Sequence, residues 1–92
     1  MKTLIPSIFI YSLVRTREGA QGYSTYNLGI RNFSSKKSHI GKVIGCSSTS
    51  SSTPYNLYTI ELLEGKKITT MRREDIIAIN EEEYAVAEIM EE

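Results

Sequence analysis

The chain has little of what catalysis and metal binding in proteins usually require. Its 92 residues include one cysteine, one histidine and no tryptophan. Because Cys46 has no second cysteine to pair with, no internal disulfide can form, which is typical of a protein from a reducing compartment. One histidine and one cysteine cannot supply the four ligands of a structural zinc site, and no glycine-rich phosphate loop is present. We therefore expect no metal and no cofactor.

His39 and Cys46 are the only candidates for a nucleophile with its base. They lie seven residues apart on one predicted strand. They would therefore point to opposite faces and lie about 23 Å apart if the strand were straight. Carboxylates are plentiful but are clustered near the end of the chain, where they are expected to form a solvated helix face. The sequence predicts a protein that is not an enzyme and has no catalytic residues.

Long apolar runs are also missing. The opening MKTLIPSIFIYSLV combines a lysine with an apolar run, as a signal peptide does, but Pro6 interrupts the run. No small-residue cleavage pattern follows before Gly19. We interpret Ile8–Val14 as the first strand, because it is far too short to be a membrane-spanning helix. The prediction is a cytoplasmic protein with no membrane partner.

Charge is balanced in total but not along the chain. Residues 1–42 carry seven basic side chains and one acidic, a net charge of +6, whereas the remainder carries four basic and ten acidic, a net charge of −6. A chain polarised in this way could bind anions with one half and a basic partner with the other. Alternatively, the two halves face each other in the monomer or in an oligomer.

The most regular pattern lies in the second half. Leu57–Leu62 has the two-residue period of a strand with one buried face. A two-residue turn after it would place Ile68 on the polar face. A three-residue loop, 63–65, with Gly65 in the left-handed conformation instead pairs Ile60 with Ile68 on the buried face. We therefore expect Ile60 and Ile68 to be neighbours in the core.

Shorter segments complete the predicted barrel. They are a strand at Ile40–Cys46, a 3₁₀ turn at Arg72–Asp75 and a closing strand at Ile76–Ile79. Gly41 and Gly45 indicate bulges or close approaches of the backbone. The run Ser47–Thr53 consists of seven hydroxyl residues and predicts a flexible loop.

A terminal helix is expected over residues 80–92. Asn80 is a good N-cap, and Glu83 stands three residues later, as in a capping box. An apolar stripe is formed by Ala85, Val86, Ile89 and Met90. We expect the stripe to pack on the barrel, because so short a helix is marginal in water unless something covers its face; contact with a partner is the alternative.

The segment GKVIG, followed by NLYTIELLEGKKITTMRREDIIAI, resembles the Tudor and KOW-type SH3-like barrels. In those barrels a G-x-V strand precedes a Y-x-V-x-L strand, an acidic residue with glycine makes the turn, and an acidic pair precedes the closing strand. The resemblance covers residues 40–79. It implies a mainly β fold, a small SH3-like barrel of about five strands with a long first loop and a short C-terminal α-helix. The acidic-aromatic signature of a polyproline-binding groove is missing.

On this interpretation, residues 1–92 form one domain with a barrel over 8–79 and a long loop over 15–39. Part of the loop is expected to form an irregular hairpin over the barrel mouth, since its apolar residues partly alternate. Loops of this length are usually functional, and tyrosine-bearing loops on a rigid scaffold suit protein recognition. We therefore predict a non-catalytic protein-interaction module: an adaptor, an inhibitor or a small subunit. The contact residues are expected to be Arg15, Arg17, Tyr23, Tyr26, Arg31 and Phe33.

Nucleic-acid binding is the alternative, with tyrosines as stacking platforms. The basic residues for that task would be Arg15, Arg17, Arg31, Lys36, Lys37 and Lys42. The neutral total charge speaks against it. A third hypothesis is a reader of a small ligand or a modified residue that uses a tyrosine cage. The small size and the unusual loop also fit a phage or viral protein acting inside an infected host cell.

Overall fold

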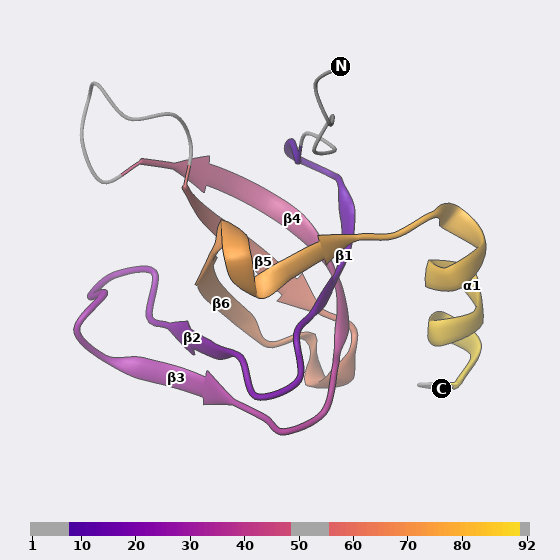
Figure 1. The fold of residues 1–92 in the computed structure, drawn as a ribbon, viewed down its shortest axis with the longest axis horizontal. Helices are drawn as coiled ribbons and strands as arrows, with labels where there is room; N and C mark the ends of the chain where they lie inside the picture. Colours follow the sequence, from indigo (N-terminus) through magenta and orange to yellow (C-terminus); the bar gives the residue numbers. More distant parts are fainter. Residues whose placement is uncertain (1–7, 49–55, 91–92) are drawn as a thin grey trace, which may run out of the picture.

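The computed structural model describes residues 8–48 and 56–90, which form one curled antiparallel sheet and a C-terminal helix (Figure 1). The sheet order is β3-β2-β6-β5-β4-β1-β7. The strands are β1 Leu13–Thr16, β2 Gln21–Tyr23, β3 Arg31–Ser34, β4 Ile40–Ser47, β5 Leu57–Leu62, β6 Ile68–Arg72 and β7 Ile76–Ala78. The helices are the 3₁₀ turns η1 Glu64–Lys66 and η2 Arg73–Asp75 and the α-helix α1 Glu81–Met90. The mainly β class is confirmed. The expected strand number of about five is too low, because the long loop contributes β2 and β3.

The first strand begins later than predicted. Residues 9–12 form a turn in which the Ser12 N–H donates to the Phe9 carbonyl at 3.0 Å, and the Ser12 hydroxyl accepts from the Phe9 N–H at 2.8 Å. Tyr11 closes this turn with a φ of 72°. The prediction of a strand from Ile8 is therefore wrong at its start: Ile8 is buried and enters the core ahead of the turn.

The predicted register of the β5–β6 hairpin is wrong by one residue. Ile60 lies opposite Thr69, and Glu61 lies opposite Ile68. The Leu62 N–H donates to the Lys67 carbonyl at 2.8 Å, so the connecting loop has four residues. Gly65 has the expected positive φ, 67°. As a result, Ile68 faces outward with 45% of its surface exposed.

Contacts with the β2–β3 hairpin explain this register. The Thr69 hydroxyl is buried and donates to the Asn32 side-chain carbonyl at 2.7 Å. The backbone of Gly22 approaches so closely that a Cβ there would come 1.9 Å from the Thr69 Oγ1. A large side chain at position 69 would collide with β2. The inward position next to Ile60 therefore requires a small residue that can be hydrogen-bonded.

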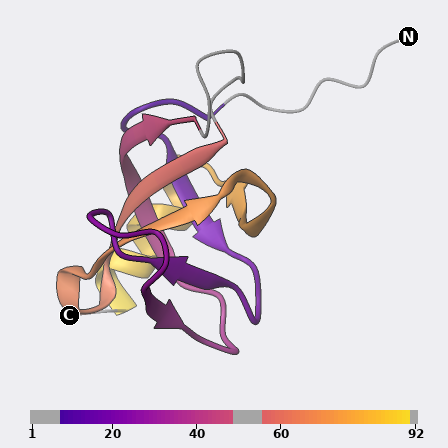
Figure 2. The ribbon, with the colours of Figure 1, turned by 90° about the vertical axis from the view of Figure 1, so that its left-hand side faces the viewer.

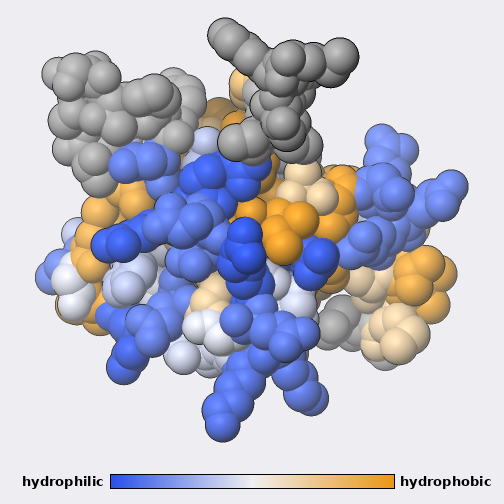
Figure 3. Space-filling view, in the orientation of Figure 1, coloured by the Kyte–Doolittle hydropathy of each residue, from blue (hydrophilic) through white to orange (hydrophobic). Residues whose placement is uncertain are grey.

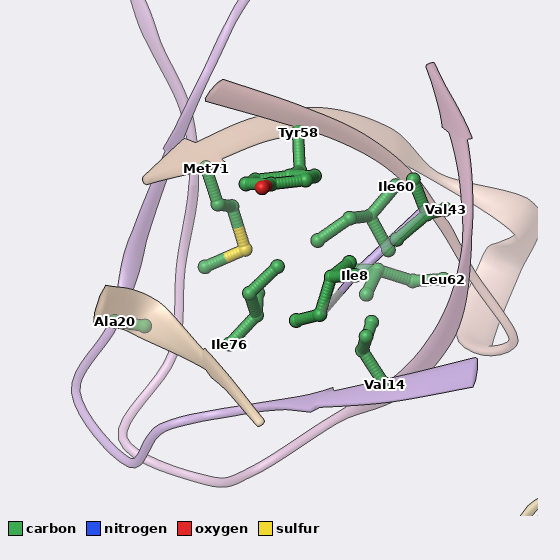
Figure 4. Packing of buried hydrophobic residues seen from close by; sticks show 9 residues of the cluster. All are labelled: Ile8, Val14, Ala20, Val43, Tyr58, Ile60, Leu62, Met71 and Ile76. Atoms are coloured by element: carbon green, nitrogen blue, oxygen red, sulfur yellow. The ribbon is translucent and has the colours of Figure 1, made fainter. Parts of the chain in front are cut away.

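The core fills the concave side of the sheet (Figure 4). Its buried apolar residues are Ile8, Val14, Ala20, Val43, Tyr58, Ile60, Leu62, Met71 and Ile76. The register of β4 against β5 shifts between Val43 and Gly45, which is the bulge expected there. A Cβ at Gly41 would come 2.7 Å from the Glu61 carbonyl oxygen, so the expected close approach of the backbone is also found.

The terminal helix is capped as predicted, because the Asn80 side chain accepts the Glu83 N–H at 2.8 Å. The expectation that its apolar stripe packs on the barrel is wrong. Val86, Ile89 and Met90 are 60%, 72% and 78% exposed. The helix instead meets the sheet through Tyr84, whose ring centroid lies 5.6 Å from the Nζ of Lys42.

The predicted loop at Ser47–Thr53 and the search for a membrane-spanning helix both depend on which residues the structure describes. Most of the run Ser47–Thr53 lies outside the described ranges, although Ser47 itself ends β4. No helix in the described part of the chain is long and apolar enough to cross a membrane.

Candidate interaction surface on the β2–β3 hairpin

The long loop contains the irregular hairpin expected from its partial alternation, and that hairpin is part of the sheet. β2 and β3 pair with a shift next to Tyr23. Tyr23 pairs with Thr70 of β6. The Thr70 hydroxyl lies 3.2 Å from the Thr25 hydroxyl and 3.1 Å from the Thr59 hydroxyl. These contacts fix the hairpin on β6 and determine where its tyrosines stand.

Three hollows of about 240, 310 and 190 Å³ adjoin Arg72, which lines part of each. We call these three hollows together the Arg72 groove; the residues that line them are Gly19, Ala20, Gln21, Tyr23, Leu28, Asn56, Leu57, Arg72, Glu74 and Asp75. Its residues come from the hairpin, β5, β6 and η2, which are separate in sequence.

The Arg72 groove combines apolar and charged lining residues. Tyr23, Leu28 and Leu57 provide apolar and aromatic surface, whereas Arg72 and the acidic η2 residues provide charge. Burial raises the pKa of the Asp75 carboxyl and the neighbouring Glu74 adds to the rise, while Arg72 and Arg17 oppose it. The groove can therefore accept an apolar side chain beside groups that donate or accept hydrogen bonds.

A separate hollow of about 300 Å³ lies on the outer face of the sheet. We call it the Ile68 groove; it is lined by Ser24, Thr25, Tyr26, Asn32, Ile44, Thr59 and Ile68. Tyr26, at the hairpin tip, is completely exposed. Ile44 and Ile68 are also partly exposed, so the walls of this groove are mostly apolar.

The residues expected to contact a partner do not lie in one place. Tyr23 lines the Arg72 groove and Tyr26 lines the Ile68 groove. Arg31 is exposed on β3. Phe33 packs partly against the core, with its ring edge-to-face to His39 at 5.4 Å.

The two arginines of the β1 region have partners within the chain. The Arg15 Nε lies 3.8 Å from a Glu83 carboxylate oxygen of α1. The Arg17 side chain donates to the Glu74 carbonyl, and the Arg17 N–H donates to the Asp75 carbonyl at 2.9 Å. Arg17 therefore holds η2 at the edge of the Arg72 groove, whereas Arg15 lies beside the helix.

The basic residues predicted to bind nucleic acid are also divided between two parts of the surface. Arg31, Lys36 and Lys37 are exposed on β3 and the turn that follows it. Lys42 lies over the Tyr84 ring and Arg15 lies beside Glu83. Among the described residues, the basic half and the acidic helix thus touch within one chain, at Arg15–Glu83 and at Lys42–Tyr84.

His39 holds two turns together. Its Nδ1 lies 3.0 Å from a Glu64 carboxylate oxygen, and its Nε2 lies 2.8 Å from the Ser35 hydroxyl. Cys46 packs against the core, and burial raises the pKa of its thiol. Within residues 8–48 and 56–90, no three His, Cys, Asp or Glu side chains are grouped closely enough to hold a metal ion.

Sequence reasoning missed Leu57, Arg72, Glu74 and Asp75 as groove residues. Leu57 is an apolar residue on the polar face of an alternating strand, and this position could have indicated a surface contact. The other three were assigned only to a turn. Their proximity to Tyr23 depends on the pairing of β2 with β6.

No protein-family model matches the chain, and no curated protein and no solved structure matches it significantly. The interpretation of function therefore depends on the geometry described above.

Proposed function

We propose that the protein is a non-catalytic protein-interaction module, an adaptor, an inhibitor or a small subunit of an assembly. The partner binds through the hairpin of residues 15–39 together with the barrel residues that share the Arg72 groove with it, and the remainder of the barrel is scaffold. The observation that supports this most is the Arg72 groove, in which Tyr23 and Leu28 of the hairpin line hollows that Arg72 also lines. Aromatic and arginine side chains are the types that dominate binding energy at protein interfaces.

The groove suits an extended segment of the partner. Leu28 and Leu57 would cover an apolar side chain of that segment. The Arg72 guanidinium would donate to a carbonyl or a carboxylate beside it, and Glu74 would accept from an N–H. Ligand sites of this kind combine apolar walls with a few polar groups that fix orientation.

We further propose that the fold is an SH3-like barrel of the Tudor or KOW type. The order β6-β5-β4-β1-β7, the hairpin between β1 and β4, and the 3₁₀ turn before the last strand support this assignment. A cytoplasmic location, including that of an infected host cell, is supported by the single cysteine, which suits a reducing compartment.

The test is capture of the partner from extracts of the native host, with nuclease present and at low and high salt. The wild-type protein is compared with a Leu28→Ala, Arg72→Ala variant. Both residues are exposed, so the variant should remain folded. If the wild-type protein captures a partner and this variant does not, the result supports the proposal.

Nucleic-acid binding is the second candidate, favoured by the exposure of Arg31, Lys36, Lys37 and Tyr26. The logarithm of its binding constant should fall with the logarithm of salt concentration by about 0.9 for each duplex phosphate contact. Nuclease-sensitive capture with that salt dependence would favour this candidate over the protein module.

A further inference from the structure

Helix α1 is attached to the sheet by few contacts. None of its residues is buried, and of these residues only Tyr84 and Ala87 are half-buried. The Glu83 carboxylate lies 3.8 Å from the Arg15 Nε of β1, and the Tyr84 ring lies under the Lys42 ammonium of β4. Figures 1 and 2 show α1 on the side of the molecule away from the β2–β3 hairpin. The helix therefore meets the described part of the sheet mainly at β1 and β4.

Both contacts are of kinds that stabilise weakly. The Arg15 and Glu83 side chains are 41% and 48% exposed, and ion pairs in water contribute little. A cation over an aromatic ring is also weak at an exposed site. The hydrophilic side chains of the first turn of α1 stand beside hydrophobic side chains at its outer end (Figure 3), and a ten-residue helix is marginal in water without packing. We therefore expect α1 to open far more often than the sheet unfolds, as weakly packed elements do.

One charge on the sheet opposes the attachment. Glu61 of β5 lies opposite Lys42. Burial raises the pKa of Tyr84, and Glu88 and Glu61 add to the rise, so carboxylates of both the helix and the sheet lie near this ring. The helix itself contains four glutamates and no basic residue. Glu61 therefore repels the helix that Arg15 and Lys42 attract.

The sheet and the helix cap do not depend on each other. The last strand bond before the helix runs from the Ile79 N–H to the Leu13 carbonyl at 2.9 Å. The helix is capped from its own segment, because Asn80 accepts the Glu83 N–H with its side chain and the Tyr84 N–H with its carbonyl. The chain can therefore bend between Ile79 and Asn80 without breaking either set of bonds.

The strands below α1 carry a mixed surface on their outer face. Val14 and Gly41 are buried on the inner face, so their neighbours on β1 and β4 point outward. Leu13 pairs with Lys42, and Arg15 pairs with Ile40. These four outward residues are half-buried. Movement of α1 away from the sheet would uncover two cations beside two aliphatic side chains.

We propose that α1 is an electrostatic strap, which Arg15 and Lys42 hold closed over the outer face of β1 and β4 and which opens without unfolding of the sheet. Two cations against one carboxylate leave a net attraction, so opening becomes more frequent as salt screens the charges. The opposite charges of the two halves of the chain then serve to hold the helix by a contact that is weak enough to release. No residue of α1 lines the Arg72 groove, so the strap stands or falls independently of the proposed partner binding.

Amide hydrogen exchange of the full chain tests the strap. The amides of α1 from Tyr84 onward should exchange at least about a hundredfold faster than those of β5, because α1 opens locally whereas β5 needs global unfolding. Raising the salt concentration from about 0.05 to about 0.5 M shortens the screening length to a few ångströms and should speed the exchange of α1 about twofold or more. The amides of β5 report whether the sheet stays folded in each measurement.

Substitutions on the sheet should move the strap in both directions. Arg15→Gln and Lys42→Gln should each speed the exchange of α1 about two- to fivefold, the range of an exposed charge contact. Glu61→Gln removes the repulsion and should slow the exchange about twofold. Arg31→Gln is the control, because Arg31 is exposed on β3, which β2, β6 and β5 separate from β4; this variant should exchange as the wild type does.

A double-mutant cycle tests whether Arg15 acts through Glu83. If it does, Arg15→Gln combined with Glu83→Gln should speed the exchange of α1 no more than Arg15→Gln does alone. Protection of α1 equal to that of β5 would overturn the proposal, because the helix would then open only with the sheet. Exchange of α1 that neither salt nor Arg15→Gln nor Lys42→Gln changes would overturn it as well.

Discussion

The backbone of Gly22 lies against Thr69 so closely that a Cβ on Gly22 would come 1.9 Å from the Thr69 hydroxyl oxygen. This contact between β2 and β6 fixes a small residue at the inward position opposite Ile60. Thr69→Ile should therefore destabilise the protein by about 1–3 kcal/mol, as overpacking of a core does. Urea unfolding measures the difference.

The neighbouring position provides the control. Ile68 faces outward, and Ile68→Thr should change the free energy of unfolding by no more than about 0.5 kcal/mol. If Ile68→Thr proves the more damaging of the two, Ile68 belongs to the core and the register described above is incorrect.

The turn between β5 and β6 should be sensitive to backbone conformation alone. Gly65 has a φ of 67°, and a Cβ there would meet no atom within 4 Å. Gly65→Ala should cost about 1 kcal/mol, because a Cβ disfavours this conformation. Thermal unfolding of the alanine variant measures it, and an unchanged stability would contradict the assigned turn.

The core of the curled sheet and the proposed binding surface should be separable by mutation. Leu62 is 2% exposed, and Leu62→Ala should cost about 2–5 kcal/mol of stability through lost burial and the cavity left behind. At a temperature where the variant is still folded, its affinity for the partner should be close to that of the wild type. A variant that keeps its stability but loses its partner would show that Leu62 is part of the binding surface.

Stability should depend on pH through Asp75. Burial and Glu74 raise the pKa of this carboxyl in the folded protein, so the folded state binds more protons than the unfolded state between the ordinary pKa, about 3.9, and the raised one. Stability contributed by this group is therefore lost as pH rises through that window. Asp75→Asn should be more stable than the wild type at neutral pH, and the difference should vanish below about pH 3. Urea unfolding from acid to neutral pH measures it; a variant less stable than wild type at pH 7 would contradict the sign.

Local signals predicted the elements but not their contacts. The N-cap at Asn80 and the left-handed Gly65 depend on neighbouring residues, and both were found where expected. The register of β6 depends on Asn32, which is 37 positions away from Thr69 in the chain. No local pattern contains that information, and the outward position of Ile68 was missed for this reason.

The sequence predicted only part of the candidate site, because the rest of the site depends on strand pairing. Tyr23 and Tyr26 were selected because they are aromatic residues in a long loop. Their opposite placement on two grooves follows from the pairing of Tyr23 with Thr70. Arg72 is part of the candidate site only because of that pairing, whereas the local sequence predicted only a turn at this residue.

Quantitative capture of the partner with groove variants tests the central claim most directly. Leu28→Ala with Arg72→Ala should weaken partner binding by at least about 2 kcal/mol, the range of an interface hot spot, while the melting temperature stays nearly unchanged. Lys36→Ala with Lys37→Ala removes exposed charge outside the Arg72 groove and should bind as the wild type does, with or without nuclease. Full binding by the groove variant, or loss of binding on nuclease treatment, would contradict the account.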